Sequence, residues 1–303
     1  MEWFGQARDW AAGARGRLYA APATPFDSVG RARPEFAENY FGALVAAGAD
    51  GLAIAAHTGR GPHLSAGVRT ELIGAARRAG AATVAGAVTA EEVRVAAAAG
   101  AEAVLVFPAP GDAGAVRRHL DRLWEAGGLP LIGFDLYTAP YRDDVFAAVV
   151  THPAVAAVKL ARLSDAIACQ DRIALVREHG KLAVTGEDRM FGASLTWGAE
   201  AALVGIAAAA VGITRAVLDT FTGNDLPAFL AATRRLDTLA ATTFREPMDG
   251  YVQRMAWIAG AEGSLPGELL TDPYAPALAD DEREQVLSVH RALTTVQSPV
   301  RAN

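Results

Sequence analysis

Cysteine and lysine are almost missing from this sequence. Cys169 is the only cysteine in 303 residues, which excludes an internal disulfide and any cysteine-based metal cluster. Lys159 and Lys181 are the only lysines, and every other basic side chain except histidine is an arginine. The net charge is −6 and the signs are interspersed, so the chain lacks the basic stripe of a nucleic-acid-binding protein. We therefore expect no nucleic acid partner.

Long apolar segments are also missing. The N-terminal stretch "MEWFGQARDWAAGARGR" has an early acid and no apolar core, so it does not resemble a secretory signal. The longest apolar run, "AALVGIAAAAVGI", is too short to cross a bilayer. These absences predict a soluble cytoplasmic protein without a membrane partner.

Short strand-like runs alternate with amphipathic helical stretches along most of the chain. Each run is almost continuously apolar, as is typical of a parallel sheet covered by helices, and each is followed by enough residues for a crossover helix. Eight such runs begin at Arg17, Gly51, Ala82, Glu102, Pro130, Ala154, Lys181 and Ala201. No G-x-G-x-x-G fingerprint follows the first run. The pattern predicts the α/β class, as a (β/α)8 TIM barrel and not as an open doubly wound sheet.

The pattern changes near the end of the eighth run, where it becomes purely helical. We predict an N-terminal extension over residues 1–16, a catalytic barrel over 17–212 and a C-terminal helical region over 213–303. We expect the helical region to pack beside the barrel or at a subunit contact.

Polar residues that end the apolar runs are the candidates for chemistry, because such barrels carry their active sites at the C-terminal ends of the strands. They contain no His-x-His pair and no carboxylates at ligand spacing, so no metal is predicted. The candidates are Thr24, His57, Thr58, Asp135, Tyr137, Lys159, Glu187 and Asp188.

Lys159 is the only amine among these candidates. An ammonium among apolar strand residues is penalised by desolvation, which lowers its pKa and frees the lone pair for attack on a carbonyl. The alternative is a strand-end lysine paired with a carboxylate. Lys181 serves as an internal comparison, because it begins its run at the opposite end of the barrel, where a solvated lysine is expected.

Two neighbouring segments offer partners for such an amine. Tyr137 ends the fifth run, next to the strand of Lys159, so its phenol is a candidate acid or base; the alternative is an aromatic that caps the barrel. The turn "HTGRG" follows the second run, and its backbone N–H groups and the Thr58 hydroxyl are suited to hold a carboxylate.

Six segments, in order, resemble the dihydrodipicolinate synthase / N-acetylneuraminate lyase family of Schiff-base (β/α)8 enzymes over about residues 17–297. "ATPFDSVG" is similar to T-P-F/M-D-x-x-G, "HTGRGPHLS" to x-T-G-E-x-x-x-L-S and "LYTAPYR" to L-Y-N-x-P-x-R. "VKLARLSD" is similar to I-K-x-x-x-x-D, with one more residue between the lysine and the aspartate, "TGED" to S-G-D-D and "ALVGI" to the strand-eight segment.

The resemblance implies a function and a set of site residues. Lys159 would form the Schiff base with pyruvate or another 2-oxo acid, Tyr137 would move protons, and Thr58 would bind the carboxylate. Four further positions of the matched segments are implied to bind substrate, namely Gly59, Arg142, Gly186 and Val204. The resemblance also implies a homodimer or homotetramer and no cofactor.

The sequence departs from the family pattern at three places. His57 replaces a small hydroxyl residue, Arg60 replaces a glutamate, and the loop "VFPAPGDAG" lacks the family's relay tyrosine, which comes from the neighbouring subunit. His57 is therefore either a substitute acid/base or a residue that orients Tyr137. Arg60 either binds an anionic second substrate or is a solvated turn residue.

These departures predict a lysine-dependent aldolase or lyase that is not dihydrodipicolinate synthase itself. The alternative is a family member that has lost catalysis and binds or senses a small oxo acid. A phosphate-binding barrel enzyme fits less well, because the segments after the last two runs offer few glycines.

Overall fold

The chain forms a closed barrel of eight parallel strands that follow one another around the barrel in chain order. The computed structural model describes residues 4–295, and strand β8 pairs with β1 to close the sheet. The strands are β1 (Leu18–Ala20), β2 (Gly51–Ile54), β3 (Ala82–Ala87), β4 (Ala103–Val106), β5 (Leu131–Leu136), β6 (Val155–Ala161), β7 (Leu182–Thr185) and β8 (Ala201–Val204). The predicted (β/α)8 barrel is confirmed.

Helices follow the strands and surround them. They are α1 (Gly5–Ala14), α2 (Ala37–Ala46), α3 (Ala66–Arg78), α4 (Ala90–Ala99), α5 (Ala113–Gly127), α6 (Asp143–Val150), α7 (Ala166–Glu178), α8 (Phe191–Thr196), α9 (Val211–Thr222), α10 (Leu226–Thr243), α11 (Tyr251–Ala261) and α12 (Glu282–Thr295). Short 3₁₀ turns are η1 (Pro34–Phe36), η2 (Gly61–His63), η3 (Ile206–Ala208), η4 (Met248–Gly250) and η5 (Gly267–Leu269). Side-chain caps fix several of the starts; Thr89 and Glu92, for example, form a capping box at α4.

Side chains of β6 alternate between two buried layers. Val158 and Leu160 belong to the layer between the sheet and the helices, whereas Ala157 and Ala161 belong to the layer inside the barrel. Successive side chains of a strand point to opposite faces, so Lys159, between Val158 and Leu160, points into the barrel. The alternation places the amine where the substrate of such a barrel is expected.

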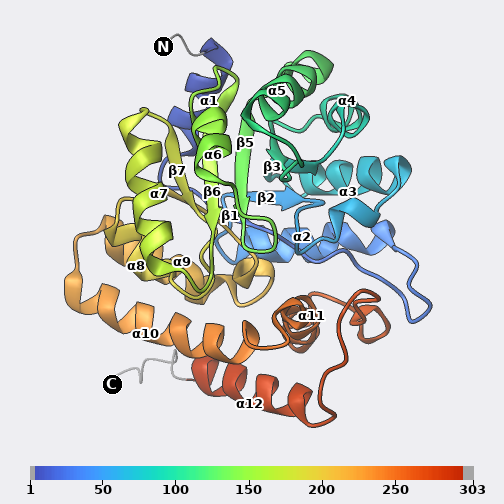
Figure 1. Ribbon diagram of the computed structural model, residues 1–303. Helices are drawn as coiled ribbons and strands as arrows, with labels where there is room; N and C mark the ends of the chain where they lie inside the picture. Colours follow the sequence, from blue (N-terminus) through green and yellow to red (C-terminus); the bar gives the residue numbers. More distant parts are fainter. Residues whose placement is uncertain (1–3, 296–303) are drawn as a thin grey trace.

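The two ends of the barrel are covered by different parts of the chain (Figure 1). Helix α1 packs Ala7, Ala11 and Ala14 against the interior layer, and the N–H of Gly16 bonds to Glu200 just before β8. The predicted extension is therefore a helix that closes the N-terminal end of the barrel. Residues 1–3 of that extension lie outside the described residues.

The C-terminal helices α10, α11 and α12 lie at the opposite end of the barrel (Figure 1). Side chains of η4 and α11 reach the loops after β2 and β5, so this part of the region covers the carboxyl end of the barrel and not its flank. The predicted alternative, a subunit contact, stays a prediction. Residues 296–303 of the predicted helical region lie outside the described residues, and the exact boundaries of the three predicted regions stay predictions. No helix between residues 4 and 295 is long and apolar enough to cross a membrane.

Candidate active site

Lys159 is buried, with 5% of the residue exposed. Its Nζ lies 4.0 Å from the centroid of the Phe134 ring, which occupies the paired position on β5. Within residues 4–295 Nζ makes no hydrogen bond, so no acceptor there holds its protons. Burial lowers the pKa of Lys159 to about 8, against the opposing attraction of Asp188 and Glu187. At pH 7 about a tenth of this amine is therefore unprotonated, far more than at the ordinary lysine pKa.

The segment after β7 packs directly against this amine. A Cβ on Gly186 would lie 2.5 Å from Cε of Lys159 and 2.8 Å from the carbonyl oxygen of Leu160, so only glycine fits there. Asp188 is buried and its Oδ1 accepts the N–H of Ile206 at 2.7 Å. Burial raises the pKa of Asp188 to about 7, and Lys159 opposes that rise.

Tyr137 begins the loop after β5, and its hydroxyl donates to Oδ1 of Asp249 at 2.5 Å. Asp249 lies in η4, in the C-terminal part of the chain. Burial, the neighbouring Tyr251 and the Asp249 carboxylate all raise the pKa of Tyr137. The phenol therefore keeps its proton at neutral pH unless a neighbour accepts it.

Thr58 and His57 share one partner, the hydroxyl of Tyr251 at the start of α11. The distance from this oxygen to Thr58 Oγ1 is 3.1 Å, and that to His57 Nδ1 is 3.0 Å. Tyr251 is 4% exposed and Thr58 is 3% exposed, so the hydroxyl pair is shielded from solvent.

His57 is neutral near pH 7, because burial lowers its pKa to about 4. Its ring lies edge-on to Tyr137 with 5.8 Å between centroids, yet its hydrogen bond goes to Tyr251. A neutral imidazole is a poor proton donor, so the geometry favours a hydrogen-bonding role for His57. Its predicted role as an acid/base stays a prediction.

The turn after β2 is fixed by backbone constraints. The Thr24 hydroxyl donates to the carbonyl of Gly59 at 2.7 Å. A Cβ on Gly61 would lie 1.8 Å from the carbonyl oxygen of Ala55, so the turn closes only with glycine there. A Cβ on Gly205 would lie 2.9 Å from Thr58 Oγ1, which places Thr58 beside the end of β8, where Val204 lies.

Arg60 is not the solvated turn residue that one interpretation predicts, because it is 6% exposed. Its Nη2 donates to Asp272 at 2.6 Å and its Nε donates to the same carboxylate oxygen at 3.1 Å. Nη2 also donates to the carbonyl of Asp249 at 3.1 Å. The guanidinium is thus engaged by protein groups, and this geometry does not favour the alternative of an anionic second substrate.

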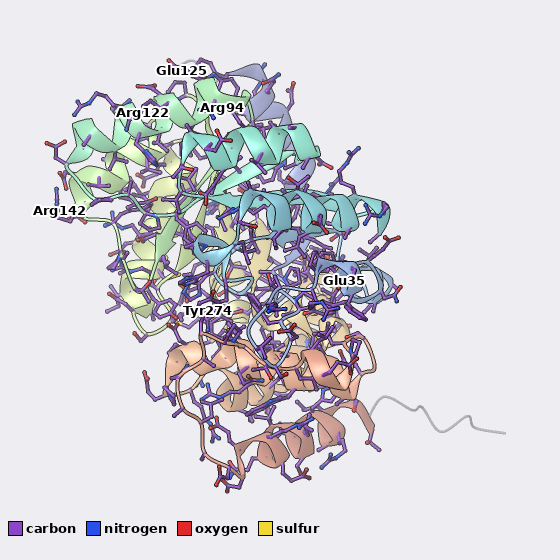
Figure 2. The ribbon with its side chains drawn as sticks, turned by 90° about the vertical axis from the view of Figure 1, so that its right-hand side faces the viewer. Glu35, Arg94, Arg122, Glu125, Arg142 and Tyr274 are labelled. Atoms are coloured by element: carbon purple, nitrogen blue, oxygen red, sulfur yellow. The ribbon has the colours of Figure 1, made fainter. Side chains whose placement is uncertain are left out.

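Arg142 is separated from the other predicted site residues. Its side chain is 64% exposed and pairs with Asp144, and Figure 2 shows it at the periphery of the barrel. The N-terminus of α6 begins at the next residue, and the exposed pair with Asp144 draws the guanidinium outward. The structure brings together Lys159, Tyr137, Thr58, His57, Gly59 and Gly186 at the carboxyl ends of the strands, but it leaves Arg142 at the rim. Val204 ends β8 there, but its side chain belongs to the layer between the sheet and the helices and points away from the barrel interior.

Lys181 is buried, which corrects the expectation of a solvated lysine. It is 1% exposed, and its Nζ donates to the carbonyls of His152 and Val155 at 3.1 and 2.7 Å. Burial lowers its pKa to about 8. The apolar run that Lys181 begins does not reveal this, because one carbonyl lies three residues before β6 and the other belongs to its first residue.

Asp249 and Tyr251 are the functional candidates that sequence reasoning missed. They lie in "EPMDGY", more than a hundred residues after Tyr137, and no spacing within the barrel segments points to them. The available signal is that Asp249 and Tyr251 follow Pro247 closely, at the start of a predicted helix. That signal becomes informative only when the helical region is placed over the barrel mouth.

Sequence comparison gives the same family as the motifs. The model of the Dihydrodipicolinate synthetase family matches residues 14–293. A 4-hydroxy-tetrahydrodipicolinate synthase of Parasynechococcus marenigrum is 30% identical over 306 aligned positions, covering 92% of this chain and 95% of the relative.

Structure comparison finds the same fold in solved structures. Dihydrodipicolinate synthase from Bacillus clausii superposes with a TM-score of 0.81 at 18% identity, covering 93% of this chain and 99% of that one. A sialic acid aldolase from Ruminococcus gnavus gives a TM-score of 0.79 at 16% identity, covering 94% and 98%. The same barrel therefore occurs in proteins named as synthases and in one named as an aldolase.

Proposed function

The chain belongs to the dihydrodipicolinate synthetase family, and from this premise we propose that it is an aldolase or lyase that forms a Schiff base between Lys159 and a 2-oxo acid. The observation that carries the proposal is the environment of Lys159. The amine lies at the carboxyl end of β6, burial lowers its pKa to about 8, and its neighbour over Nζ is an aromatic ring. Lys181, by contrast, donates to two backbone carbonyls.

The chemistry begins when the unprotonated Lys159 amine attacks the ketone carbon. The C–N bond forms as the carbonyl electron pair moves to oxygen. That oxygen takes up two protons, one lost by the attacking nitrogen and one from an acid, and leaves as water, so an iminium remains. The iminium accepts the electron pair of a breaking C–H or C–C bond and becomes an enamine. Only groups that stabilise this transition state more than the bound substrate raise the rate.

Tyr137 and the turn after β2 have complementary roles in this proposal. Tyr137 directly follows β5, the strand that pairs with β6, and we assign to its phenol the proton transfers at the reacting atoms. The Thr58 hydroxyl and the backbone N–H groups around Gly59 are assigned to the substrate carboxylate. Gly186 leaves the space that the Lys159 side chain occupies.

The preferred substrate class is pyruvate or a related 2-oxo acid, in a reaction other than that of the synthases. Two features support this part of the proposal. The loop after β4 has no tyrosine, and the position of the family's small hydroxyl residue holds His57, which is neutral near pH 7.

An oxo-acid sensor without catalysis is the second candidate, but the site geometry favours catalysis. The sensor hypothesis rests partly on the missing relay tyrosine. Tyr251 and Asp249 supply a hydroxyl and a carboxylate at the same site, so protic groups are present. The amine of Lys159 also faces the barrel interior over an aromatic ring, unlike that of Lys181, which donates to two backbone carbonyls.

The test is a trapping screen. The protein is incubated with pyruvate, 2-oxobutyrate, 2-oxoglutarate or a 2-oxo sugar acid, then with sodium borohydride, and its intact mass is measured. We expect one stable mass increment for at least one of these acids and none for Lys159→Arg or for samples without borohydride. Absence of any adduct, with ligand-induced thermal stabilisation, would instead support the sensor.

A further inference from the structure

The segment that joins α10 to α11 is built into the active site. Arg254, which is fully buried, donates from Nη1 to the carbonyls of Thr243, Arg245 and Pro247 at 2.9, 2.8 and 3.3 Å. Arg60 donates to the carbonyl of Asp249 in the same segment. These charge-assisted bonds fix the backbone that carries Asp249 and Tyr251, so the contact between Asp249 and Tyr137 is preorganised.

Asp249 differs from the other carboxylates of the site in its exposure. Its side chain is 46% exposed, whereas Glu187 and Asp188 are 0% and 8% exposed. One carboxylate oxygen accepts the Tyr137 hydroxyl, and the exposed part faces solvent. The pair Tyr137–Asp249 is therefore a two-step connection between the interior of the barrel and bulk water.

We propose that Asp249 is a positioning residue that receives the proton of Tyr137 and takes over the function of the absent relay tyrosine within the same chain. The inference rests on the proposed Schiff-base function and deepens it. In this proposal the proton reaches solvent through a carboxylate of the C-terminal helical region.

The proposed proton transfer starts from the iminium that pyruvate forms with Lys159. A C–H bond of the methyl group breaks, its electron pair forms the new C=C bond, and the C=N π pair returns to nitrogen. The methyl proton passes to the Tyr137 oxygen while the phenolic proton passes to the Asp249 carboxylate. Exchange with water then restores the ionised carboxylate. No phenolate forms, which agrees with the burial of Tyr137 beside a carboxylate.

The experiment measures this step without the unknown aldehyde partner. In D₂O, the loss of the pyruvate methyl signal by proton NMR reports enamine formation, and borohydride trapping reports the Schiff base. For Asp249→Asn we expect trapping within about twofold of wild type and methyl exchange reduced by about 10²-fold, the usual contribution of one acid–base group. Asp249→Glu restores part of the exchange, since it keeps the carboxylate.

Glu246→Gln is the matched control, because Glu246 is an exposed carboxylate of the same segment and bonds to the N–H of Met248. We expect wild-type trapping and exchange in this variant, and thermal midpoints are compared for all variants. If Asp249→Asn is unfolded, the inference is tested with Asp249→Glu alone. A methyl exchange rate below that of the wild-type protein, with normal trapping, then supports the inference.

Three results would overturn the inference while the proposed function stands. They are wild-type exchange in Asp249→Asn, parallel loss of trapping and exchange in a folded Asp249→Asn, and an adduct in the wild-type protein without methyl exchange. Absence of the adduct from the wild-type protein would instead refute the proposed function.

Discussion

At the scale of single residues, the two lysines show that a lowered pKa does not define a nucleophile. Burial lowers the pKa of both to about 8. Lys181 lies just before β7 and donates to two carbonyls, so its protons stabilise the start of the strand. Lys159 lies on the inner face of β6 over an aromatic ring, and its lone pair can face a substrate.

The first prediction concerns the pH dependence of adduct formation. Only the neutral amine attacks a ketone, and burial lowers the pKa of Lys159 from its ordinary 10.5 to about 8. The rate of trapping with pyruvate should rise by about tenfold per pH unit below pH 8 and become constant above it. Quenched reactions between pH 6 and 10 measure this profile; a rate that still rises above pH 9 would contradict it.

Asp188→Asn provides the matched comparison for this profile. The Asp188 carboxylate favours the protonated form of Lys159, so its removal should lower the pKa of Lys159 further. The plateau of the trapping rate is expected to begin at a lower pH than in the wild-type protein. An unchanged or upward-shifted profile would show that the two groups do not interact as described.

Gly186 provides a steric prediction. In Gly186→Ala the new methyl group would lie 2.5 Å from Cε of Lys159 and 2.8 Å from a backbone carbonyl oxygen, so the amine must move. We expect loss of most adduct formation and destabilisation by about 1–3 kcal/mol, measured by trapping and urea unfolding.

Gly67→Ala is its control, because a Cβ at this position of α3 meets nothing within 4 Å and helix propensity favours alanine over glycine. Trapping should be unchanged and stability equal or higher. Equal behaviour of the two variants would argue against the close packing of Gly186 on the amine.

At the scale of elements, the turn after β2 and the segment before α11 stabilise each other. Arg60 bonds to Asp272 and to the backbone of η4. The side chains of Arg60 and Asp272 are only 7% and 3% exposed. Removal of one partner would leave an uncompensated buried charge, which is far more costly than loss of a surface pair.

The corresponding prediction is a stability measurement. Arg60→Ala should lower the free energy of unfolding by about 3–5 kcal/mol, as determined by urea denaturation. Arg78→Ala removes an arginine that is 60% exposed and paired with Glu38, and it should change stability by no more than about 0.5 kcal/mol. A small effect at Arg60 would mean that the Asp272 charge is not buried as the geometry indicates.

The sequence predicts the barrel elements well and the mouth of the barrel poorly. The eight strands are found because their side chains are apolar on both faces, and this local pattern follows from helices covering a parallel sheet. Lys159 and Tyr137 follow from strand order alone. The burial of Arg60 and the contribution of Asp249 depend on contacts with residues 212 and 112 positions away along the chain, which no local period encodes.

Arg142 shows a second limit of prediction from the sequence, which concerns the direction of a side chain. Its motif position matches the family, but the side chain pairs with Asp144 two residues later. A motif specifies the backbone position of a residue, whereas the direction of a long exposed side chain depends on its neighbours.

At the scale of the whole molecule, one chain contains every group that the proposed mechanism uses. The barrel provides Lys159, Tyr137 and Thr58, and the C-terminal region provides Asp249 and Tyr251. A homodimer or homotetramer stays a prediction. In this account, association is not needed to complete the proton path.

This leads to a prediction about dilution. Adduct formation per chain should stay constant from micromolar to nanomolar protein, even where mass photometry shows that oligomers dissociate. Circular dichroism of the most dilute samples that allow it checks that the chain remains folded. A rate that falls in parallel with the oligomer fraction in folded protein would mean that a neighbouring subunit completes the site.

The most direct test of the central claim is the location of the trapped adduct. The chain has only three primary amines, namely Lys159, Lys181 and the N-terminal amine, so peptide mass spectrometry after borohydride reduction with pyruvate distinguishes them completely. The account predicts the reduced adduct on the peptide that contains Lys159 and an unmodified Lys181. An adduct on Lys181 or on the N-terminus, with an unmodified Lys159, would contradict it.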